Sequence, residues 1–364
     1  MRVVVGISGG VDSAVAALLL KRAGHDVIGV YMHNWEDDDP DAVCTALEDA
    51  KSAIAVCEHL GIPLLTANFA AEYSRRVFEE FLAEHRAGRT PNPDIWCNKE
   101  IKFKAFLDYA VRHGAEHIAT GHYARLEVRD GRPRLLKAAD RNKDQTYFLC
   151  AVAPSALART VFPLGTLTKP EVRALAREAG LPNHDRADST GICFIGERNY
   201  KAFLARYLPP QPGDIRTLDG EKKGTHDGLM YYTLGQRHGL GIGGPGEPWY
   251  VVGKDAAANI LYVAQGEHHP ALYHDVLVAD VPHWINPPAG TRLAAKTRYR
   301  QPDQPCRIEP LPDGRLRVIF DRPQRALTPG QAVVFYEGDE CLGGARILAT
   351  EARTAPDRAA AGSC

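Results

Sequence analysis

The sequence lacks the features that mark several whole classes of protein. No stretch approaches the ~18 consecutive apolar residues of a membrane-spanning helix, and the eight cysteines form no Cys-x-x-Cys pair. Zinc-ribbon and thioredoxin-type motifs are therefore excluded. Lysine and arginine number 44 against 45 for aspartate and glutamate. With charges so balanced, a nucleic acid would have to bind a local basic patch rather than an overall positive field.

The composition itself is that of an ordinary globular chain. Its 364 residues are 45% hydrophobic and 24% charged, which excludes disordered, collagen-like and coiled-coil proteins. The length allows two or three domains. The first apolar stretch reaches Asp12 too early for a secretory signal, and eight scattered cysteines suit a reducing compartment. We therefore expect a cytoplasmic protein with no membrane partner.

Three parts of the chain differ in pattern. Residues 1–206 alternate strands, expected at 2–7, 26–32, 63–67 and 116–120, with helices, which predicts an α/β domain with a parallel sheet. A proline-rich break at 208–213 separates this domain from a small Gly-rich central domain at 207–270. Residues 271–350 contain short strands separated by turns and predict a β-barrel, one strand being expected at 293–300. Residues 351–364 read as a flexible tail.

A glycine-rich loop follows the first expected strand. Its sequence is Gly6-Ile7-Ser8-Gly9-Gly10-Val11-Asp12-Ser13. Glycines let backbone N–H groups approach an anion, and the helix that follows adds a partial positive charge. No lysine ends the loop, so it is not a Walker A loop. The spacing predicts a phosphate site, with an ordinary strand–helix turn as the alternative.

Two cysteines stand among turn-forming and polar residues rather than on a periodic apolar face. Cys97 follows two prolines, and we expect it at or just before a helix N-terminus, where Lys99 and Lys102 would favour the thiolate. Asp94 is placed three residues upstream to pass a proton. Cys193 lies between Gly191 and Gly196. The other cysteines are expected to be buried filler, apart from Cys364 in the tail; these are Cys44, Cys57, Cys150, Cys306 and Cys341.

The stretch 292–300 has four basic residues and no acidic one. If it forms one strand, Lys296, Arg298 and Arg300 share a face, since successive side chains alternate. Such a stripe suits a phosphate backbone. A solvated strand face is an equally good interpretation.

Five motifs together resemble the bacterial tRNA-specific 2-thiouridylase family of N-type ATP pyrophosphatases. They are Ser8–Ser13, Asn92-Pro93-Asp94 with Cys97, Lys143-Asp144-Gln145, Gly191-Ile192-Cys193-Phe194-Ile195-Gly196 and the segment 233–244. The resemblance implies that the glycine loop holds ATP together with Met32 and Gly121. Asp12 would work with Mg²⁺, and no resident metal is implied.

The same resemblance implies a reaction. Uridine 34 of tRNA would be adenylated by ATP and then converted to 2-thiouridine, with AMP and pyrophosphate as products. Cys193 would carry a persulfide from a sulfur-relay donor protein, and Cys97 would act as the second thiol. Asp94 would be the acid/base at the target base, in a pocket shaped by Asn92 and Pro93. Contacts to the anticodon arm would come from Lys143, Asp144, Gln145, Arg298 and Tyr299.

Three alternatives remain at this level. An amide-forming ligase would share the phosphate loop but has no use for Cys97 and Cys193. A non-catalytic RNA-binding protein could keep a relic nucleotide site, although Asp12 and Asp94 are present. An iron–sulfur cluster on Asp94, Cys97 and Cys193 would replace the persulfide. Because neither motif has a further cysteine nearby, the persulfide is the preferred hypothesis.

Overall fold

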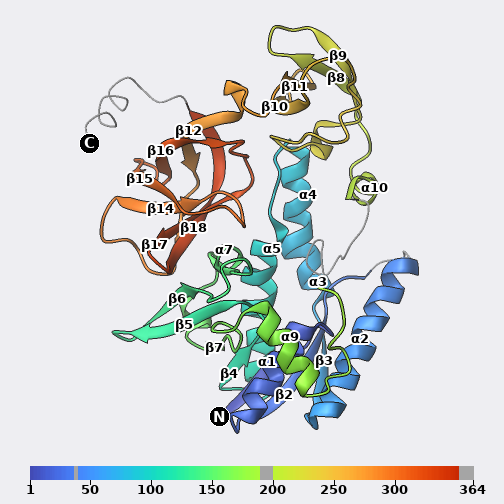
Figure 1. Cartoon of the computed structure of the whole chain (residues 1–364), viewed down its shortest axis with the longest axis vertical. Helices are drawn as coiled ribbons and strands as arrows, with labels where there is room; N and C mark the ends of the chain where they lie inside the picture. The colour runs from blue at the N-terminus through green and yellow to red at the C-terminus, as the bar shows by residue number, and fades with distance from the viewer. Residues whose placement is uncertain (37–39, 189–199, 352–364) are drawn as a thin grey trace.

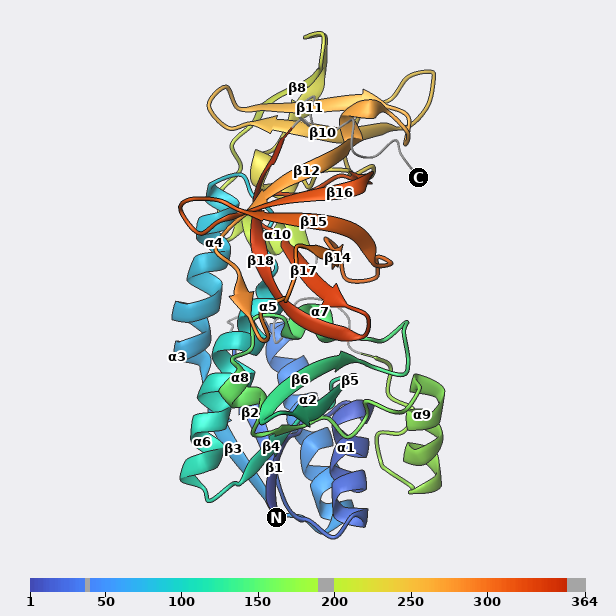
Figure 2. The same ribbon diagram turned by 90° about the vertical axis from the view of Figure 1, so that its left-hand side faces the viewer.

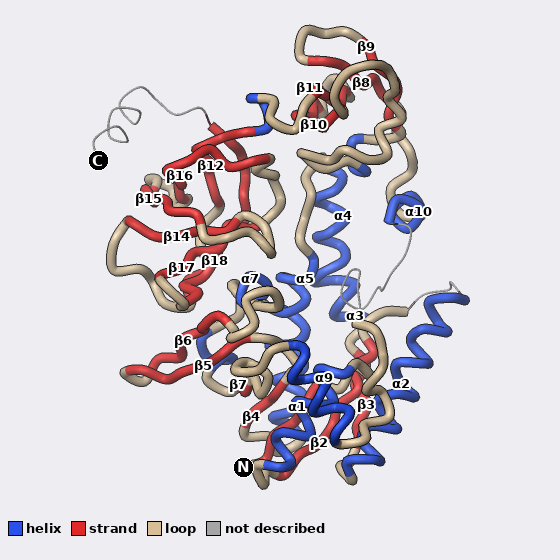
Figure 3. The backbone as a smooth tube through the Cα atoms, in the orientation of Figure 1, coloured by secondary structure: helices blue, strands red, loops and turns tan. Residues whose placement is uncertain are grey.

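The computed structural model describes residues 1–36, 40–188 and 200–351 (Figure 1). Cys193, Cys364 and the acidic residues 37–39 fall outside these ranges, as does the side chain of Cys44. Helices gather mainly around the N-terminal sheet, whereas the C-terminal half consists mostly of strands (Figure 3). This division follows the change of sequence pattern after residue 206.

A five-stranded parallel sheet organises the N-terminal part, in the order β3-β2-β1-β4-β7. Its strands are β1 (Arg2–Gly6), β2 (Asp26–His33), β3 (Leu64–Asn68), β4 (His117–Ala119) and β7 (Thr160–Val161). The four strands expected from the sequence are present, and the α/β fold class is confirmed. The two residues of β7 are too few to produce a periodic pattern.

Helical layers cover both faces of this sheet. Val3 and Val5 pack into a core shared with α1 (Val11–Arg22), α2 (Pro40–Leu60) and α9 (Lys169–Glu178). Val4 packs into the opposite core. Because alternate side chains of a strand point to opposite faces, a run of three valines serves both layers.

The opposite layer contains two long helical runs. The first comprises α3 (Ala70–Tyr73), the π-helical segment η1 (Ser74–Phe78) and α4 (Glu79–Arg86). The second comprises α5 (Pro93–Trp96), the π-helical segment η2 (Cys97–Ala105) and α6 (Phe106–Arg112). The second run begins at Pro93, whose fixed φ angle suits the first helical position. The expectation that Cys97 stands at the helix N-terminus is therefore wrong, because Cys97 is the fifth helical residue.

Four strands form the sheet of the central part, in the order β10-β11-β8-β9. They are β8 (Gly213–Thr217), β9 (Lys222–His226), β10 (Trp249–Asp255) and β11 (Ile260–Gln265). Short helices connect the larger elements along the chain: α7 (Thr146–Leu149), α8 (Pro154–Leu157), α10 (Tyr200–Ala205), η3 (Leu229–Tyr231) and η4 (Pro270–Leu272). No helix within the described ranges is both long and apolar enough to cross a membrane.

The C-terminal part is a barrel of six strands in the order β12-β16-β15-β14-β17-β18, closed by pairing of β12 with β18. The strands are β12 (Tyr273–Ala279), β14 (Arg292–Lys296), β15 (Gln304–Pro310), β16 (Leu316–Arg325), β17 (Ala332–Glu337) and β18 (Glu340–Glu351). The predicted barrel is confirmed. The closing strand β18 was not expected from the sequence, because Gly343 and Gly344 interrupt its pattern.

A hairpin of the N-terminal part joins this barrel. It consists of β5 (Ala124–Arg129) and β6 (Arg132–Lys137), and β6 pairs with the start of β18, which also pairs with β13 (His283–Trp284). Figure 2 shows the barrel directly above this hairpin. The two parts are thus connected by continuous backbone hydrogen bonding, which fixes one against the other.

Buried His85 connects α4 to the central part. Its Nδ1 donates to the Met230 carbonyl at 3.2 Å, and its Nε2 accepts from the Tyr200 hydroxyl at 2.8 Å. The bond that Nε2 accepts needs the neutral ring, and burial lowers the pKa of His85 to about 4. The stability from this neutral ring is complete above pH 6.5, the ordinary pKa, and is lost as the pH falls from there.

We therefore expect the free energy of unfolding to fall by about 2 kcal/mol between pH 6.5 and pH 5. Urea unfolding at several pH values measures this loss. His85→Gln, which keeps a donor and an acceptor without titrating, should remove most of the slope. An unchanged slope in the variant would assign the pH dependence to other groups.

Candidate active site

The glycine loop turns tightly between β1 and α1. Gly9 has a φ of +82°, and a Cβ added there would lie 2.5 Å from the Asp49 carbonyl oxygen. Only glycine fits this position without strain. Gly10 caps α1, and within the described part of the chain no cap side chain accepts from the first N–H groups of the helix. These N–H groups and the helix dipole are available to an anion.

Three side chains from distant segments of the chain donate hydrogen bonds to one backbone carbonyl of the loop. The Gly9 carbonyl accepts from Ser52 Oγ at 2.7 Å, Asn183 Nδ2 at 2.8 Å and Arg186 Nη1 at 3.2 Å. Arg186 also pairs with Asp49 of α2. The loop is thus fixed before any ligand binds. Sequence reasoning missed these residues, because nothing local to 52, 183 or 186 indicates the loop.

Met32 and Gly121 lie where the sequence placed them, at the carboxyl ends of β2 and β4, the strands on either side of β1. A Cβ on Gly121 would lie 2.8 Å from the backbone of Asp12 and Ser13, so this close approach requires glycine. A Cβ on Gly6 would lie 3.1 Å from the Met32 side chain. The structure brings the residues of the predicted nucleotide site together, and their binding of ATP stays a prediction.

A lysine supplies the cation that the loop itself lacks. Lys169, at the first position of α9, places Nζ 2.6 Å from Asp12 Oδ1 and 2.8 Å from Asp188 Oδ1. Lys169 is only 9% exposed. Tyr123 donates to the same Asp12 oxygen at 2.8 Å, and burial raises the pKa of Tyr123 far above its ordinary value, so its hydroxyl stays a donor. Sequence reasoning missed Lys169. The residues around it, Thr168 and Glu171, form a capping box, which predicts the start of a helix but not a lysine beside the loop.

Asp188, the last residue of the described range 40–188, forms ion pairs with three basic side chains. Lys143, Lys169 and Arg173 all lie within 2.8 Å of its carboxylate. Burial alone would raise the pKa of Asp188, but hydrogen bonds from Lys143 and Lys169 hold it well below its ordinary range. Asp188 therefore stays ionised at neutral pH. Cys193 follows five residues later, outside the described residues, so its predicted approach to Cys97 is not tested.

Cys97 is completely buried, in the same core as Val4 and Phe106. This contradicts the expectation that it avoids an apolar face, because the helical run turns this position into the core. Asp94, one turn earlier on the same face, is partly exposed. So are Asn92 and Pro93, and the residues expected around the target base therefore reach the surface while the thiol lies beneath them.

The helix of Cys97 also contacts the phosphate loop. The Phe106 ring lies 3.6 Å from the position of a Cβ on Gly6. Asn98 Nδ2 donates to the Phe148 carbonyl at 3.0 Å, and its buried Oδ1 has no partner among the described residues. One continuous helical run thus connects the predicted nucleotide site with the predicted sulfur site.

The other described cysteines are buried filler, as expected. Burial raises the pKa of Cys57 to about 11 and those of Cys150 and Cys306 to about 12, and raises the pKa of Cys341 well above its ordinary value. Protonated, buried thiols are poor nucleophiles. At neutral pH these four thiols stay protonated.

The residues expected to contact tRNA come together across two domains. Tyr299 donates to the Lys143 carbonyl at 3.4 Å and its ring lies 4.5 Å from that of Phe148. Asp144 is buried. Gln145 Oε1 accepts from the Tyr123 N–H at 2.9 Å, and Arg298 donates to the Ala326 carbonyl at 3.0 Å. The contact of Tyr299 with Lys143 and Phe148 joins the barrel to the N-terminal part, and the role of this motif set in RNA binding stays a prediction.

The expected basic stripe is wrong in its geometry. Strand β14 ends at Lys296, so Arg298 and Arg300 lie in the following turn rather than on the same strand face. The turn is fixed by Gln301 Oε1, which accepts from the Thr297 N–H at 2.8 Å. Lys296 is buried, whereas Arg298 and Arg300 are exposed.

A fixed glycine loop at the carboxyl edge of a parallel sheet, with Asp12 and Lys169 beside it, is typical of α/β proteins that bind nucleotide phosphates. Family models match three consecutive segments: a tRNA methyl transferase HUP domain at 1–197, a tRNA methyl transferase PRC-barrel domain at 201–265 and an aminomethyltransferase beta-barrel domain at 274–347.

Full-length relatives identify the family. The chain is 59% identical to the tRNA-specific 2-thiouridylase MnmA of Geobacillus thermodenitrificans and to that of Halalkalibacterium halodurans, in each case over 95% of this chain and 94% of the relative. A solved 4-thiouridine synthetase complexed with RNA and ATP covers 57% of this chain at 18% identity and a TM-score of 0.34, too low for a functional comparison. This chain belongs to the tRNA-specific 2-thiouridylase family.

Proposed function

We propose that this chain is an ATP-dependent tRNA sulfurtransferase that converts uridine 34 to 2-thiouridine. The relatives' name supports the general activity. The observation that carries the detailed proposal is the close approach of the Phe106 ring, in the helical run of Cys97, to Gly6 of the phosphate loop: the ring lies 3.6 Å from where a Cβ of Gly6 would stand. Nucleotide activation and sulfur chemistry require neighbouring sites, and this approach supports the proposal because the two elements that carry the candidate residues adjoin each other.

The first step activates the base. Oxygen is a poor leaving group from C2, so O2 of uridine attacks the α-phosphorus of ATP and pyrophosphate leaves. The loop N–H groups and Lys169 would neutralise the departing phosphates. Asp12 is the described carboxylate best placed for Mg²⁺, which prefers one or two carboxylates together with substrate phosphates and would supply further neutralisation. Asp94 would handle the proton at the base, beside Asn92 and Pro93.

The second step transfers sulfur. The terminal sulfur of a Cys193 persulfide attacks C2, and AMP leaves. The Cys97 thiolate then attacks Cys193 Sγ, which breaks the sulfur–sulfur bond, leaves the thiocarbonyl on the base and forms a Cys97–Cys193 disulfide. A cellular thiol reduces the disulfide, and a sulfur-relay protein reloads Cys193. A disulfide needs Cα atoms within about 7 Å, so we expect Cys193 to approach Cys97 during the reaction. Cys97 must then become accessible from its buried position.

Nucleoside analysis of tRNA tests the function. Cells lacking this protein should lose 2-thiouridine at position 34, and the wild-type gene should restore it. Purified protein with ATP, tRNA and a persulfide donor should release one pyrophosphate for each 2-thiouridine. Pyrophosphate release with an amide-forming substrate instead would indicate a ligase, and no release with tRNA would indicate a binding protein. Stoichiometric iron in protein purified without oxygen would favour the cluster over the persulfide.

A further inference from the structure

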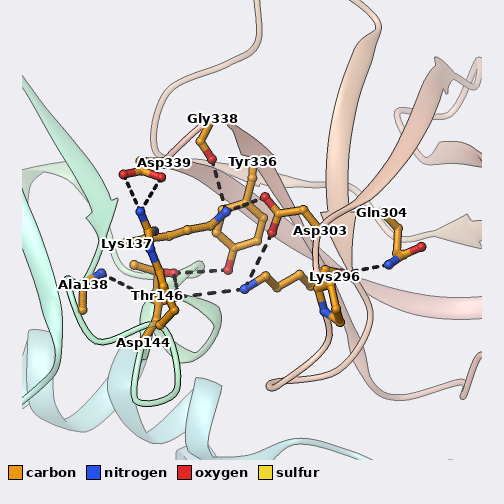
Figure 4. Close-up of polar contacts among 12 residues, drawn as sticks. Lys137, Ala138, Asp144, Thr146, Lys296, Asp303, Gln304, Tyr336, Gly338 and Asp339 are labelled. Carbon is orange, nitrogen blue, oxygen red and sulfur yellow. Dashed lines mark hydrogen bonds and ion pairs between the residues drawn. The ribbon is translucent and has the colours of Figure 1, made fainter. Parts of the chain in front are cut away.

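A polar cavity of about 450 Å³ lies where the barrel meets the N-terminal part (Figure 4). Two lysines from different parts of the chain line it: Lys137 ends β6 and Lys296 ends β14. They are only 6% and 9% exposed. Burying an ammonium group is costly unless partners compensate it. Lys137 was not among the residues expected to contact RNA, and Lys296 was expected to do so only as part of the basic stripe at 292–300.

The two lysines share one carboxylate. Lys137 Nζ lies 2.5 Å from Asp303 Oδ2, and Lys296 Nζ lies 3.7 Å from Asp303 Oδ1. The Tyr336 ring lies beneath both cations, with its centroid 4.5 Å from Lys137 Nζ and 5.1 Å from Lys296 Nζ. Lys296 is also 4.0 Å from Asp144 Oδ2. Both of its carboxylate distances exceed those of a hydrogen bond, so Lys296 is loosely compensated.

The other two carboxylates that line the cavity, Asp144 and Asp339, have hydrogen-bond partners other than the two lysines. Asp144 accepts from the Ala138 N–H at 3.0 Å and from the Thr146 hydroxyl at 2.8 Å. Asp339 forms a two-oxygen pair with Arg141, at 2.9 and 2.8 Å. Asp303 differs from buried Asp144 in having a side chain that is 33% exposed, and from Asp339 in facing the two lysines rather than Arg141; it lies in the connection between β14 and β15. It can move outward without breaking a strand.

We infer that the cavity is a subsite for a phosphate of the RNA backbone and that Asp303 occupies the anion position when RNA is absent. The inference rests on the proposed function, because it takes tRNA as the ligand. A phosphodiester would place its charge between Lys137 and Lys296, and Asp303 would turn toward solvent. Exposed Arg141 and Arg300 line the same cavity and provide an electrostatic entrance for a polyanion.

Two substitutions with opposite expected effects test the subsite. Asp303→Asn removes the competing charge at nearly constant shape, so tRNA binding should tighten by about fivefold. Lys296→Met should weaken binding by about tenfold and reduce the slope of log K against log salt by about one. Arg292→Met removes an exposed cation at the other end of β14, paired with Asp321, and should change neither quantity. Fluorescence anisotropy with labelled anticodon-arm RNA measures all four proteins.

Asp303→Asn separates this inference from a structural role. If Asp303 only holds the domains together, Asp303→Asn weakens tRNA binding. Tighter tRNA binding by this variant supports the subsite. Unchanged or weaker binding overturns the inference. This reading stands even if Lys296→Met does not fold. Calorimetry measures whether the wild-type protein binds inorganic phosphate. If it does, and if Lys296→Met abolishes this binding but leaves tRNA affinity unchanged, the cavity is a site for free phosphate and the inference is overturned. Wild-type thiolation activity is measured alongside, and only its absence would count against the proposed function.

Discussion

Replacing Cys97 with alanine is expected to reduce 2-thiouridine formation about a thousandfold or more, while ATP-dependent pyrophosphate release with tRNA stays near the wild-type rate. The thiol would act only after the base has been activated, so its removal should stop the second step and spare the first. Single-turnover assays that quantify pyrophosphate and 2-thiouridine in the same reaction measure the two steps separately. The wild-type reaction should also contain the Cys97–Cys193 disulfide, detected by mass spectrometry.

Cys57→Ala is the matched control for this substitution. Cys57 is also buried, at 1% exposure, and packs in the other core of the same domain. Each truncation should cost about 1 kcal/mol of stability, but only the Cys97 variant should lose sulfur transfer. Equal activity in the two variants would contradict a chemical role for Cys97 and leave it as a packing residue.

Replacing Lys169 with methionine should slow tRNA-dependent pyrophosphate release about 100- to 1000-fold. The expected loss reflects removal of a preorganised cation from the site where negative charge leaves on pyrophosphate. The fold should survive, because Asp12 keeps its bond from Tyr123 and Asp188 keeps Lys143 and Arg173. Rapid-quench measurement of labelled pyrophosphate, at saturating ATP, reports the effect on the activation step.

Arg173→Met distinguishes contact with Asp12 from contact with Asp188. Arg173 lies one turn further along α9 and binds Asp188 Oδ1 at 2.6 Å. Its loss should leave pyrophosphate release within about threefold of the wild-type rate. If the Arg173 variant loses as much activity as the Lys169 variant, the charge cluster around Asp188 matters rather than the cation beside the phosphate loop.

Several features could be predicted because they depend on short-range patterns. The valine run of β1, the glycines after it and the alternation of strands with helices are local preferences, and they place the glycine loop, Met32 and Gly121 at the carboxyl ends of strands. The position of Cys97 was predicted less well. The two prolines before it suggested that the helix starts at or just after Cys97, whereas the helix begins at Pro93 and Cys97 packs in the core, which only packing against the sheet decides.

The sequence by itself determined the α/β domain, the glycine loop after its first strand and the barrel. Only the tertiary structure decided that Lys169 pairs with Asp12 across 157 positions and that Lys137 meets Asp303 across 166. The reason is physical: periodicity and turn chemistry act over a few residues, whereas a buried cation finds its partner through the packing of whole layers. No pattern near Lys137 or Lys169 distinguishes either one from a solvated surface lysine.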